Sequence, residues 1–301
     1  CSEIILRSRE FCNLSECVVR REDTRESLKE KVRTAAILGT FQSTLTEFKY
    51  LSREWKKNCD EERLLGVSLT GIMDNPLTNG SKKGLDKLLE ELRDIAYETN
   101  KEWADKLGIP VSAAITCVKP SGTVSQLVDS ASGIHARHNP HYIRTVRADN
   151  KDPLCKLMQD MGFPNEVDVT KPEHTTVFSF PMKTPKGAVC RMDMTALEQL
   201  ELWKVYAESW CEHKPSVTIS VKEDEWVEVA AWVYEHFDSI SGISFLPFSE
   251  HVYRQAPYQD CTEEEYKEAL KTMPKNVDWA ELSKYESQDY TIASQELACT
   301  A

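Results

Sequence analysis

The sequence predicts an α/β protein with parallel strand pairing, and three observations lead to this prediction. Helical and strand-like stretches alternate along most of the 301 residues. No internal repeat, low-complexity segment or clear linker interrupts them, so a single continuous unit is the simplest organisation. Apolar residues make up 41% of the chain, which is enough to bury a core at this length. Periodicity alone leaves open whether the sheet is open or closed into a barrel.

The clearest helix is expected over residues 84–108. Apolar residues recur there at three- and four-residue intervals, and Gly108 and Pro110 end the pattern. Residues 111–118 form a short apolar run with β-branched residues, which indicates a buried strand. The following KPSGTVSQL stretch leads into another helix.

The same alternation continues downstream. Strands are expected at residues 216–221 and 242–247, with a helix around 225–237 between them. Two further helices are expected to begin at capping boxes, in which Glu follows Thr by three residues. These pairs are Thr195 with Glu198, and Thr262 with Glu265.

Composition excludes several classes of protein. The ten cysteines include no Cys-x-x-Cys pair, which argues against a zinc ribbon or a thioredoxin-type motif. There is no run of eighteen apolar residues, signal peptide or lipidation motif, so a cytoplasmic location is expected. The net charge of −12 disfavours non-specific binding to nucleic acid or anionic lipid. A local basic pocket can still hold an anionic small molecule.

The first candidate site is the loop Pro120-Ser121-Gly122-Thr123 between the expected strand and helix. It supplies hydroxyls, a glycine that lets the backbone approach a ligand, and backbone N–H groups at a helix start, a combination suited to an anion. An ordinary capped helix is the alternative, because Ser and Thr are the usual N-caps.

The second candidate is the segment that begins SGIH at residue 132. Its histidines are spaced by three residues, but Pro140 interrupts any helix that would align them, so no metal site is predicted. Its arginines are candidates for phosphate contacts or for pairing with carboxylates. The residues concerned are His135, His138, His141, Arg137, Arg144 and Arg147.

The third candidate is the start of the chain. Cys1 and Glu3 are separated by one residue and would project to the same side of an extended segment, where they could act on one small substrate. Cys12 supplies a second thiol eleven residues after the first. The alternative is that these are inert buried cysteines, the common case.

In this order, these segments resemble the adenosylcobalamin-dependent (class II) ribonucleotide reductases, and most closely the monomeric type that reduces ribonucleoside triphosphates. The residues that carry the resemblance are Cys1-Ser2-Glu3-Ile4-Ile5-Leu6, Phe11-Cys12-Asn13-Leu14, Leu65-Gly66-Val67-Ser68-Leu69-Thr70-Gly71-Ile72, Lys119-Pro120-Ser121-Gly122-Thr123-Val124, Ser132-Gly133-Ile134-His135, Tyr142-Ile143-Arg144 and Cys299. Gly122 favours this class over the iron-dependent one, whose loop reads Pro-Ser-Glu-Thr. The resemblance implies the C-terminal half of the ten-stranded α/β barrel.

The resemblance also implies a role for each residue. Cys1 would become a thiyl radical and remove the 3′ hydrogen of the ribose, and Glu3 would take the proton of the 3′-hydroxyl. Cys12 would be one of two thiols that end as a disulfide. Cys299 would pass electrons inward by thiol–disulfide exchange. The substrate phosphates would be held by the loop residues Pro120, Ser121, Gly122 and Thr123, with Ser125.

The same resemblance implies adenosylcobalamin as cofactor, a thioredoxin-type reductant, and a missing N-terminal half that carries the nucleotide effector site. Residues 1–290 would belong to the catalytic barrel and residues 291–301 to a truncated redox-active tail. The isolated chain is expected to be inactive. Its start at Cys1 suggests a segment that follows an intein. The competing prediction is a non-catalytic nucleotide-binding or assembly module; a metal-binding protein is more distant.

Overall fold

The computed structural model describes residues 3–248 and 253–286, and its contacts divide the chain into two compact units. Unit 1 is drawn from Cys1–Arg137 and Pro185–Phe248, and unit 2 from His138–Thr184 and Ser249–Ala301. No composition shift marks these junctions, so the sequence suggested one continuous unit. The expected boundary between a barrel domain and a tail at residues 290 and 291 lies outside the described residues.

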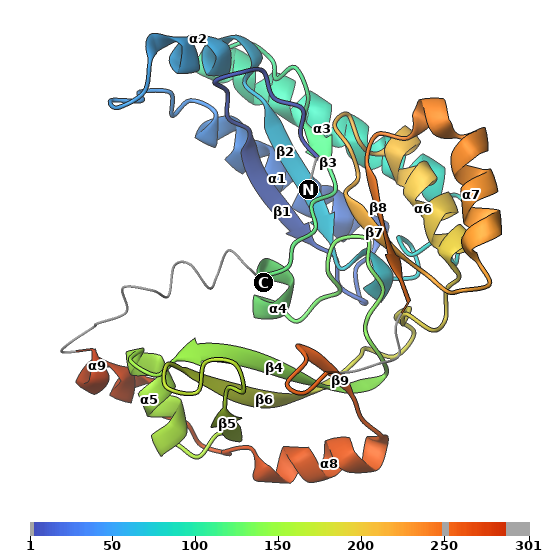
Figure 1. Ribbon diagram of the computed structural model, residues 1–301. Helices are drawn as coiled ribbons and strands as arrows, with labels where there is room; N and C mark the ends of the chain where they lie inside the picture. The colour runs from blue at the N-terminus through green and yellow to red at the C-terminus, as the bar shows by residue number, and fades with distance from the viewer. Residues whose placement is uncertain (1–2, 249–252, 287–301) are drawn as a thin grey trace. The chain divides into compact units, whose positions relative to one another are not determined.

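Unit 1 is built on parallel strands (Figure 1). β1 (Asn13–Val18), β2 (Leu65–Thr70) and β3 (Thr116–Cys117) form one sheet in that order, and β7 (Val217–Val221) pairs with β8 (Ile243–Pro247). A parallel bridge between Val118 and Pro215 joins β3 to β7. The α/β fold class is therefore confirmed, and the strand order is β1-β2-β3-β7-β8.

Helices connect these strands. The longer ones are α1 (Arg25–Gln42), α2 (Arg53–Glu62), α3 (Leu85–Leu107), α6 (Ala196–Ser209) and α7 (Trp226–Glu235). The shorter ones are η1 (Ile72–Asp74), α4 (Val124–Leu127) and η2 (Phe237–Ser239). None of the helices in the described part of the chain combines the length and apolar character needed to cross a lipid bilayer.

The two faces of the β1-β2-β3 sheet have different surroundings. Leu65, Val67 and Leu69 belong to the core cluster that also contains residues of α1 and α3. Their neighbours Gly66 and Ser68 point to the opposite face, because side chains alternate along a strand. One face of the sheet therefore holds the core. The other carries polar side chains and thiols beside the partly exposed Leu14.

Unit 2 contains an antiparallel sheet in the order β5-β6-β4-β9, so the expected parallel pairing is wrong for this part of the chain. The strands are β4 (His141–Asp149), β5 (Asn165–Val167), β6 (Thr175–Lys183) and β9 (Tyr258–Asp260). The helices are α5 (Pro153–Asp160), α8 (Glu263–Thr272), η3 (Trp279–Glu281) and α9 (Leu282–Tyr285). Alternation of helix and strand does not fix strand direction, and here nine-residue pairing of β4 with β6 decides it.

Most individual elements of the sequence analysis are confirmed. α3 ends at Gly108, which caps the helix in the left-handed conformation with φ +67°. Both capping boxes are present, at Thr195 and at Thr262. β3 and α4 are shorter than the sequence suggested, because the chain leaves the sheet after Cys117 and enters a tight turn at Ser121, where φ is +49°.

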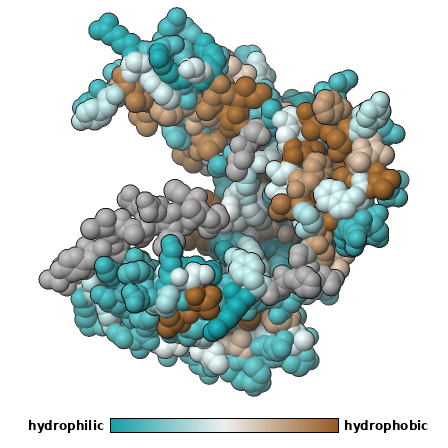
Figure 2. Space-filling model, viewed as in Figure 1, coloured by the Kyte–Doolittle hydropathy of each residue, from teal (hydrophilic) through white to brown (hydrophobic). Residues whose placement is uncertain are grey.

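Apolar side chains remain on the surface of unit 1. Figure 2 shows them gathered over the region of α6, α7 and β8. Val227, Phe237 and Leu246 are among the large exposed apolar residues there.

Within the described residues β8 pairs with β7 alone, and β1 pairs with β2 alone, so each has one edge without a strand partner.

Gly71, which follows β2, is predicted to be essential to the fold. Its φ is +77°, and a Cβ there would collide with the backbone oxygen of Val19. Gly84 is a matched control, because its φ is +86° with no atom within 4 Å of the added carbon. We expect Gly84→Ala to cost about 1 kcal/mol and Gly71→Ala about 2–4 kcal/mol in urea unfolding. Equal losses in the two variants would contradict the collision.

Candidate active site

The polar face of the β1-β2-β3 sheet brings together the candidate residues from the start of the chain and from the loop after β3. A Cβ on Gly66 would lie 2.3 Å from Leu14 Cδ2, and the sulfurs of Cys12 and Cys117 would be 3.3 Å and 3.5 Å from it. Any larger residue at Gly66 would fill this space. Glycine in the middle of β2 therefore leaves room for the Leu14 side chain and for two thiols on one face.

Glu3 is buried at this site, with 7% of its surface exposed. Its backbone oxygen accepts a hydrogen bond from the Lys214 N–H at 3.0 Å, which fixes the segment in place. Its Oε1 accepts from Lys119 Nζ at 3.1 Å. Its Oε2 is buried and has no hydrogen-bond partner among the described residues. An unpaired buried oxygen of this kind is costly, so it suits a ligand that donates a hydrogen bond.

Cys12 lies half-buried beside β1. Burial raises the pKa of its thiol to about 12, and the carboxylates of Glu10 and Glu3 act in the same direction. Burial also raises the pKa of Cys117. Both groups are therefore thiols rather than thiolates at neutral pH. Cys1 and Cys299 lie outside the described residues, so their predicted roles stay predictions.

The loop after β3 is hydrogen-bonded to the neighbouring strand β2. The Lys119 N–H donates to Ser68 Oγ at 2.8 Å. Ser121 then takes a positive φ, which only a few side chains adopt. Gly122 borders open space, with no atom within 4 Å of an added Cβ. Among the described residues the Ser125 Oγ is buried without a partner.

The SGIH segment packs directly against this loop. Gly133 has φ +53°, and a Cβ there would lie 2.5 Å from the backbone oxygen of Lys119. The Ser132 hydroxyl donates to the backbone oxygen of Pro120 in a short hydrogen bond. The two segments that the sequence analysis treated separately are therefore one layered structure, and Gly133 permits their close approach.

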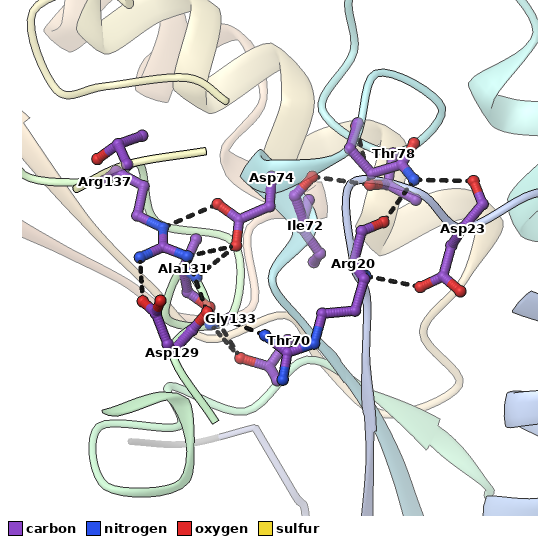
Figure 3. A network of polar contacts seen from close by, with 12 residues as sticks. Arg20, Asp23, Thr70, Ile72, Asp74, Thr78, Asp129, Ala131, Gly133 and Arg137 are labelled. Carbon is purple, nitrogen blue, oxygen red and sulfur yellow. Dashed lines mark hydrogen bonds and ion pairs between the residues drawn. The ribbon is translucent and has the colours of Figure 1, made fainter. Parts of the chain in front are cut away.

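Figure 3 shows the polar network that holds this layered structure at the end of β2. Arg137 forms a two-pronged ion pair with Asp74, with distances of 2.9 Å from Nε to Oδ1 and 2.8 Å from Nη2 to Oδ2. Both side chains are only 3% exposed. The second oxygen of Asp74 also accepts from the Ala131 N–H at 2.9 Å. The guanidinium of Arg137, a candidate phosphate ligand, is thus used in a structural ion pair.

The remaining histidines and arginines of this segment do not form a metal site. In the described ranges no group of three His, Cys, Asp or Glu residues is arranged to hold a metal ion. His138 pairs with Asp260 at 2.6 Å, and the His141 ring lies 5.0 Å from that of Tyr266. Arg147 pairs with Asp168, and Arg144 lies over the ring of Tyr258. These contacts lie within unit 2.

His135 connects the SGIH segment to β7. Its Nε2 accepts from the Thr218 N–H at 3.0 Å, so the ring proton resides on Nδ1, which lies 3.0 Å from the backbone oxygen of Ser132. Burial lowers the pKa of this ring, and the Ser132 oxygen partly offsets the effect. The neutral imidazole is therefore the form that the fold stabilises.

Lys119 is the residue of this site that the sequence analysis left out of its candidates. It appeared there only as the first letter of the KPSGT stretch. The signal available was a lysine next to a predicted anion loop. Its pairing with Glu3 could not be predicted, because 116 positions separate them in the chain.

Replacement of Arg137 tests the buried ion pair. We expect Arg137→Met to lower the free energy of unfolding by about 3–5 kcal/mol, because Asp74 would keep a buried charge without its partner. Arg25→Met is the control, since Arg25 and its partner Glu91 are 47% and 37% exposed and should matter little. Urea unfolding of both variants gives the comparison. An equally small loss in both would show that the pair is not needed.

His135 predicts a loss of stability in mild acid. Its folded pKa lies below the unfolded value of 6.5, so between the two pKa values the unfolded ring takes up a proton and the folded ring does not. The free energy of unfolding should therefore fall as the pH drops from 7.5 to 5.5, and His135→Gln should make this dependence shallower. His174→Gln, at an exposed position, serves as control. An unchanged pH dependence in His135→Gln would contradict the assignment.

Comparison with known proteins was made by sequence and by structure. No protein-family model matches the chain. It is 29% identical over 279 residues to the adenosylcobalamin-dependent ribonucleoside-triphosphate reductase of Euglena gracilis, covering 92% of this chain and 38% of that protein. The enzyme of the same name from Lactobacillus gasseri is 26% identical, with 92% and 41% covered. The chain thus spans about two-fifths of the length of these relatives.

Two solved structures share the fold. A B12-dependent (class II) ribonucleotide reductase matches with a TM-score of 0.81 at 24% identity, covering 96% of this chain and 43% of that one. The alpha subunit of an Actinobacillus ureae class Id ribonucleotide reductase matches less well, with a TM-score of 0.53 at 12% identity. The resemblance that the sequence motifs indicated is therefore confirmed: along nearly its whole length the chain is similar to one part of the adenosylcobalamin-dependent ribonucleotide reductases, and it has the fold of that part.

Proposed function

We propose that this chain is the part of an adenosylcobalamin-dependent ribonucleoside-triphosphate reductase that acts on the ribose and holds the substrate phosphates. One observation carries the proposal: Glu3 has a buried Oε2 without a hydrogen-bond partner among the described residues, and its carboxylate is close enough to the uncharged thiol of Cys12 to help raise the pKa of that thiol. A carboxylate oxygen without a donor suits a sugar hydroxyl. The names of the relatives supply the reaction and the cofactor.

In this proposal Glu3 accepts the proton of the 3′-hydroxyl at Oε2, while its Oε1 stays bound to Lys119. Cys1, two residues earlier, takes the 3′ hydrogen atom. Cys12 gives up a hydrogen as a neutral thiol and ends in a disulfide with a thiol from outside this chain. Burial around Glu3 keeps water away from the carboxylate and strengthens its hydrogen bonds.

The cofactor would meet the segment that carries Cys1 and Glu3. A hydrogen atom is taken from a thiol and not from a thiolate, and burial keeps the neighbouring thiols of Cys12 and Cys117 protonated, so this face suits hydrogen-atom chemistry. When bound, adenosylcobalamin supplies the radical that these side chains do not generate by themselves.

The substrate phosphates are assigned to the loop at 120–125. Ser121, Thr123 and Ser125 supply hydroxyls, and Gly122 leaves the backbone open to a ligand. Ser125 Oγ, buried without a partner in the described residues, is the donor most in need of an acceptor. Arg137, Arg144 and Arg147 are not assigned to phosphates, because each has a partner in the fold.

Several partners belong to the proposal. An N-terminal part would pair with the strand edges of β1 and β8 and complete the barrel. That part would also bring the second thiol for Cys12 and a nucleotide effector site. A thioredoxin-type reductant would act through Cys299, in the cytoplasm, in deoxyribonucleotide synthesis for DNA replication. The isolated chain would be inactive.

The test is reduction of CTP by the completed enzyme with adenosylcobalamin and a dithiol. We expect no product from Cys1→Ser, and a rate about 10²- to 10⁴-fold lower from Glu3→Gln, because the proton acceptor is lost. Cys17→Ala and Glu91→Gln are the controls and should keep the activity, since Cys17 belongs to the core cluster on the opposite face of the sheet and Glu91 lies on α3, which packs against that core.

Full activity in Cys1→Ser would contradict the proposal. The competing function, a non-catalytic nucleotide-binding module, gives a different pattern. In that case nucleotide binding would persist in Cys1→Ser, Glu3→Gln and Cys12→Ser, and the completed protein would form no deoxyribonucleotide at all.

A further inference from the structure

Lys119 lies at the half-buried start of the loop after β3 and is fixed in place by contacts with two other segments. Its N–H donates to Ser68 Oγ at 2.8 Å, which ties it to the middle of β2. Its backbone oxygen is covered by Gly133, whose missing Cβ would lie 2.5 Å away. Two independent segments therefore set the direction in which this side chain leaves the backbone.

The side chain ends among acidic groups. Its Nζ lies 3.1 Å from Glu3 Oε1, and 39% of the lysine side chain is exposed against 8% of that of Glu3. Burial raises the pKa of Cys12, Cys117 and Glu16, and for all three the ammonium of Lys119 opposes this effect. One cation thus acts on two carboxylates and two thiols on a single face of the sheet.

The contact with Lys119 leaves the two oxygens of Glu3 in different states. Oε1 has a charged donor, while Oε2 has no partner in the described part of the chain. A carboxylate held through one oxygen has a fixed orientation, and its other oxygen is directed to whatever enters the site. A freely rotating carboxylate would have to be ordered each time a ligand binds.

We propose that Lys119 is a positioning residue, which holds Glu3 through Oε1 so that Oε2 is directed at the substrate hydroxyl. The role of Glu3 toward a substrate hydroxyl rests on the proposed function. The charge arrangement around Lys119 does not depend on it. It links two segments that the proposed function uses separately, because Lys119 immediately precedes the phosphate loop. Movement of that loop would therefore move the proton acceptor as well.

The alternative use of Lys119 is direct binding of a phosphate. The two uses predict different kinetics. Loss of a phosphate contact raises KM and leaves kcat unchanged, whereas loss of a positioning contact lowers kcat with little change in KM.

The first measurement is the kinetics of the completed enzyme. We expect Lys119→Met to lower kcat about 10- to 100-fold, the size of a lost charge-assisted hydrogen bond, with KM within about 2-fold. Lys119→Arg should recover most of the rate. Lys31→Met is the matched control, because Lys31 is 35% exposed and pairs at 2.6 Å with Asp23, which is 6% exposed, at a place without a role in the reaction. Its kcat should not change.

The second measurement uses this chain without cofactor or substrate. Alkylation of Cys12 by iodoacetamide at pH 9, followed by peptide mass spectrometry, reports the thiolate fraction. We expect slower alkylation in Lys119→Met, because the cation that favours the thiolate is gone, and no change in Lys31→Met. Circular dichroism of each variant establishes that it is folded.

These measurements distinguish a positioning role of Lys119 from direct phosphate binding. A higher KM with unchanged kcat in Lys119→Met would overturn the positioning role. Equal rates of Cys12 alkylation in Lys119→Met and wild type would overturn the charge arrangement around Lys119. If wild type forms no deoxyribonucleotide, the proposed function fails and the role toward a substrate hydroxyl fails with it. If alkylation is nevertheless slower in Lys119→Met, the effect of the Lys119 charge on Cys12 holds, and only the proposed function is wrong.

Discussion

The buried ion pair between Asp74 and Arg137 is the interaction on which the candidate site depends. Asp74 follows β2 through η1, and Arg137 ends the segment that carries Ser132 and Gly133. Burial of two charges is favourable only when both are fully hydrogen-bonded, and here both are satisfied in a two-pronged geometry. The pair therefore specifies one position for this segment, since any displacement would leave a charge unpaired in the core.

The position of that segment decides the position of the loop above it. Gly133 lies against the backbone of Lys119, and Ser132 binds the backbone of Pro120. The loop in turn carries the lysine that holds Glu3. A chain of contacts thus runs from the core to the carboxylate. Each step is a packing or hydrogen-bond contact with little room for adjustment, and such rigidity would suit the proton transfer that we propose for Glu3.

Charge is distributed unevenly in this protein. The chain as a whole carries a net charge of −12, which would oppose the approach of an anionic ligand. Near the polar face of the sheet, Lys119 supplies a local positive charge among the carboxylates. The thiols there are kept protonated by burial, despite this cation. Local desolvation and one fixed charge, rather than the overall balance, therefore set the chemistry of this face.

Local features of the sequence were sufficient for much of the fold. The periodicity of α3, the capping boxes at Thr195 and Thr262, and the glycine that ends α3 act within a few residues, so the sequence by itself determined them. The ordered motifs from Glu3 to the loop at 120–125 also indicated the right family of folds. Strand direction in unit 2, the division into two units, and the pairing of Lys119 with Glu3 were decided only by the tertiary structure. Each depends on groups far apart in the chain, and short-range patterns carry no information about which distant partner will satisfy a buried charge or a free strand edge.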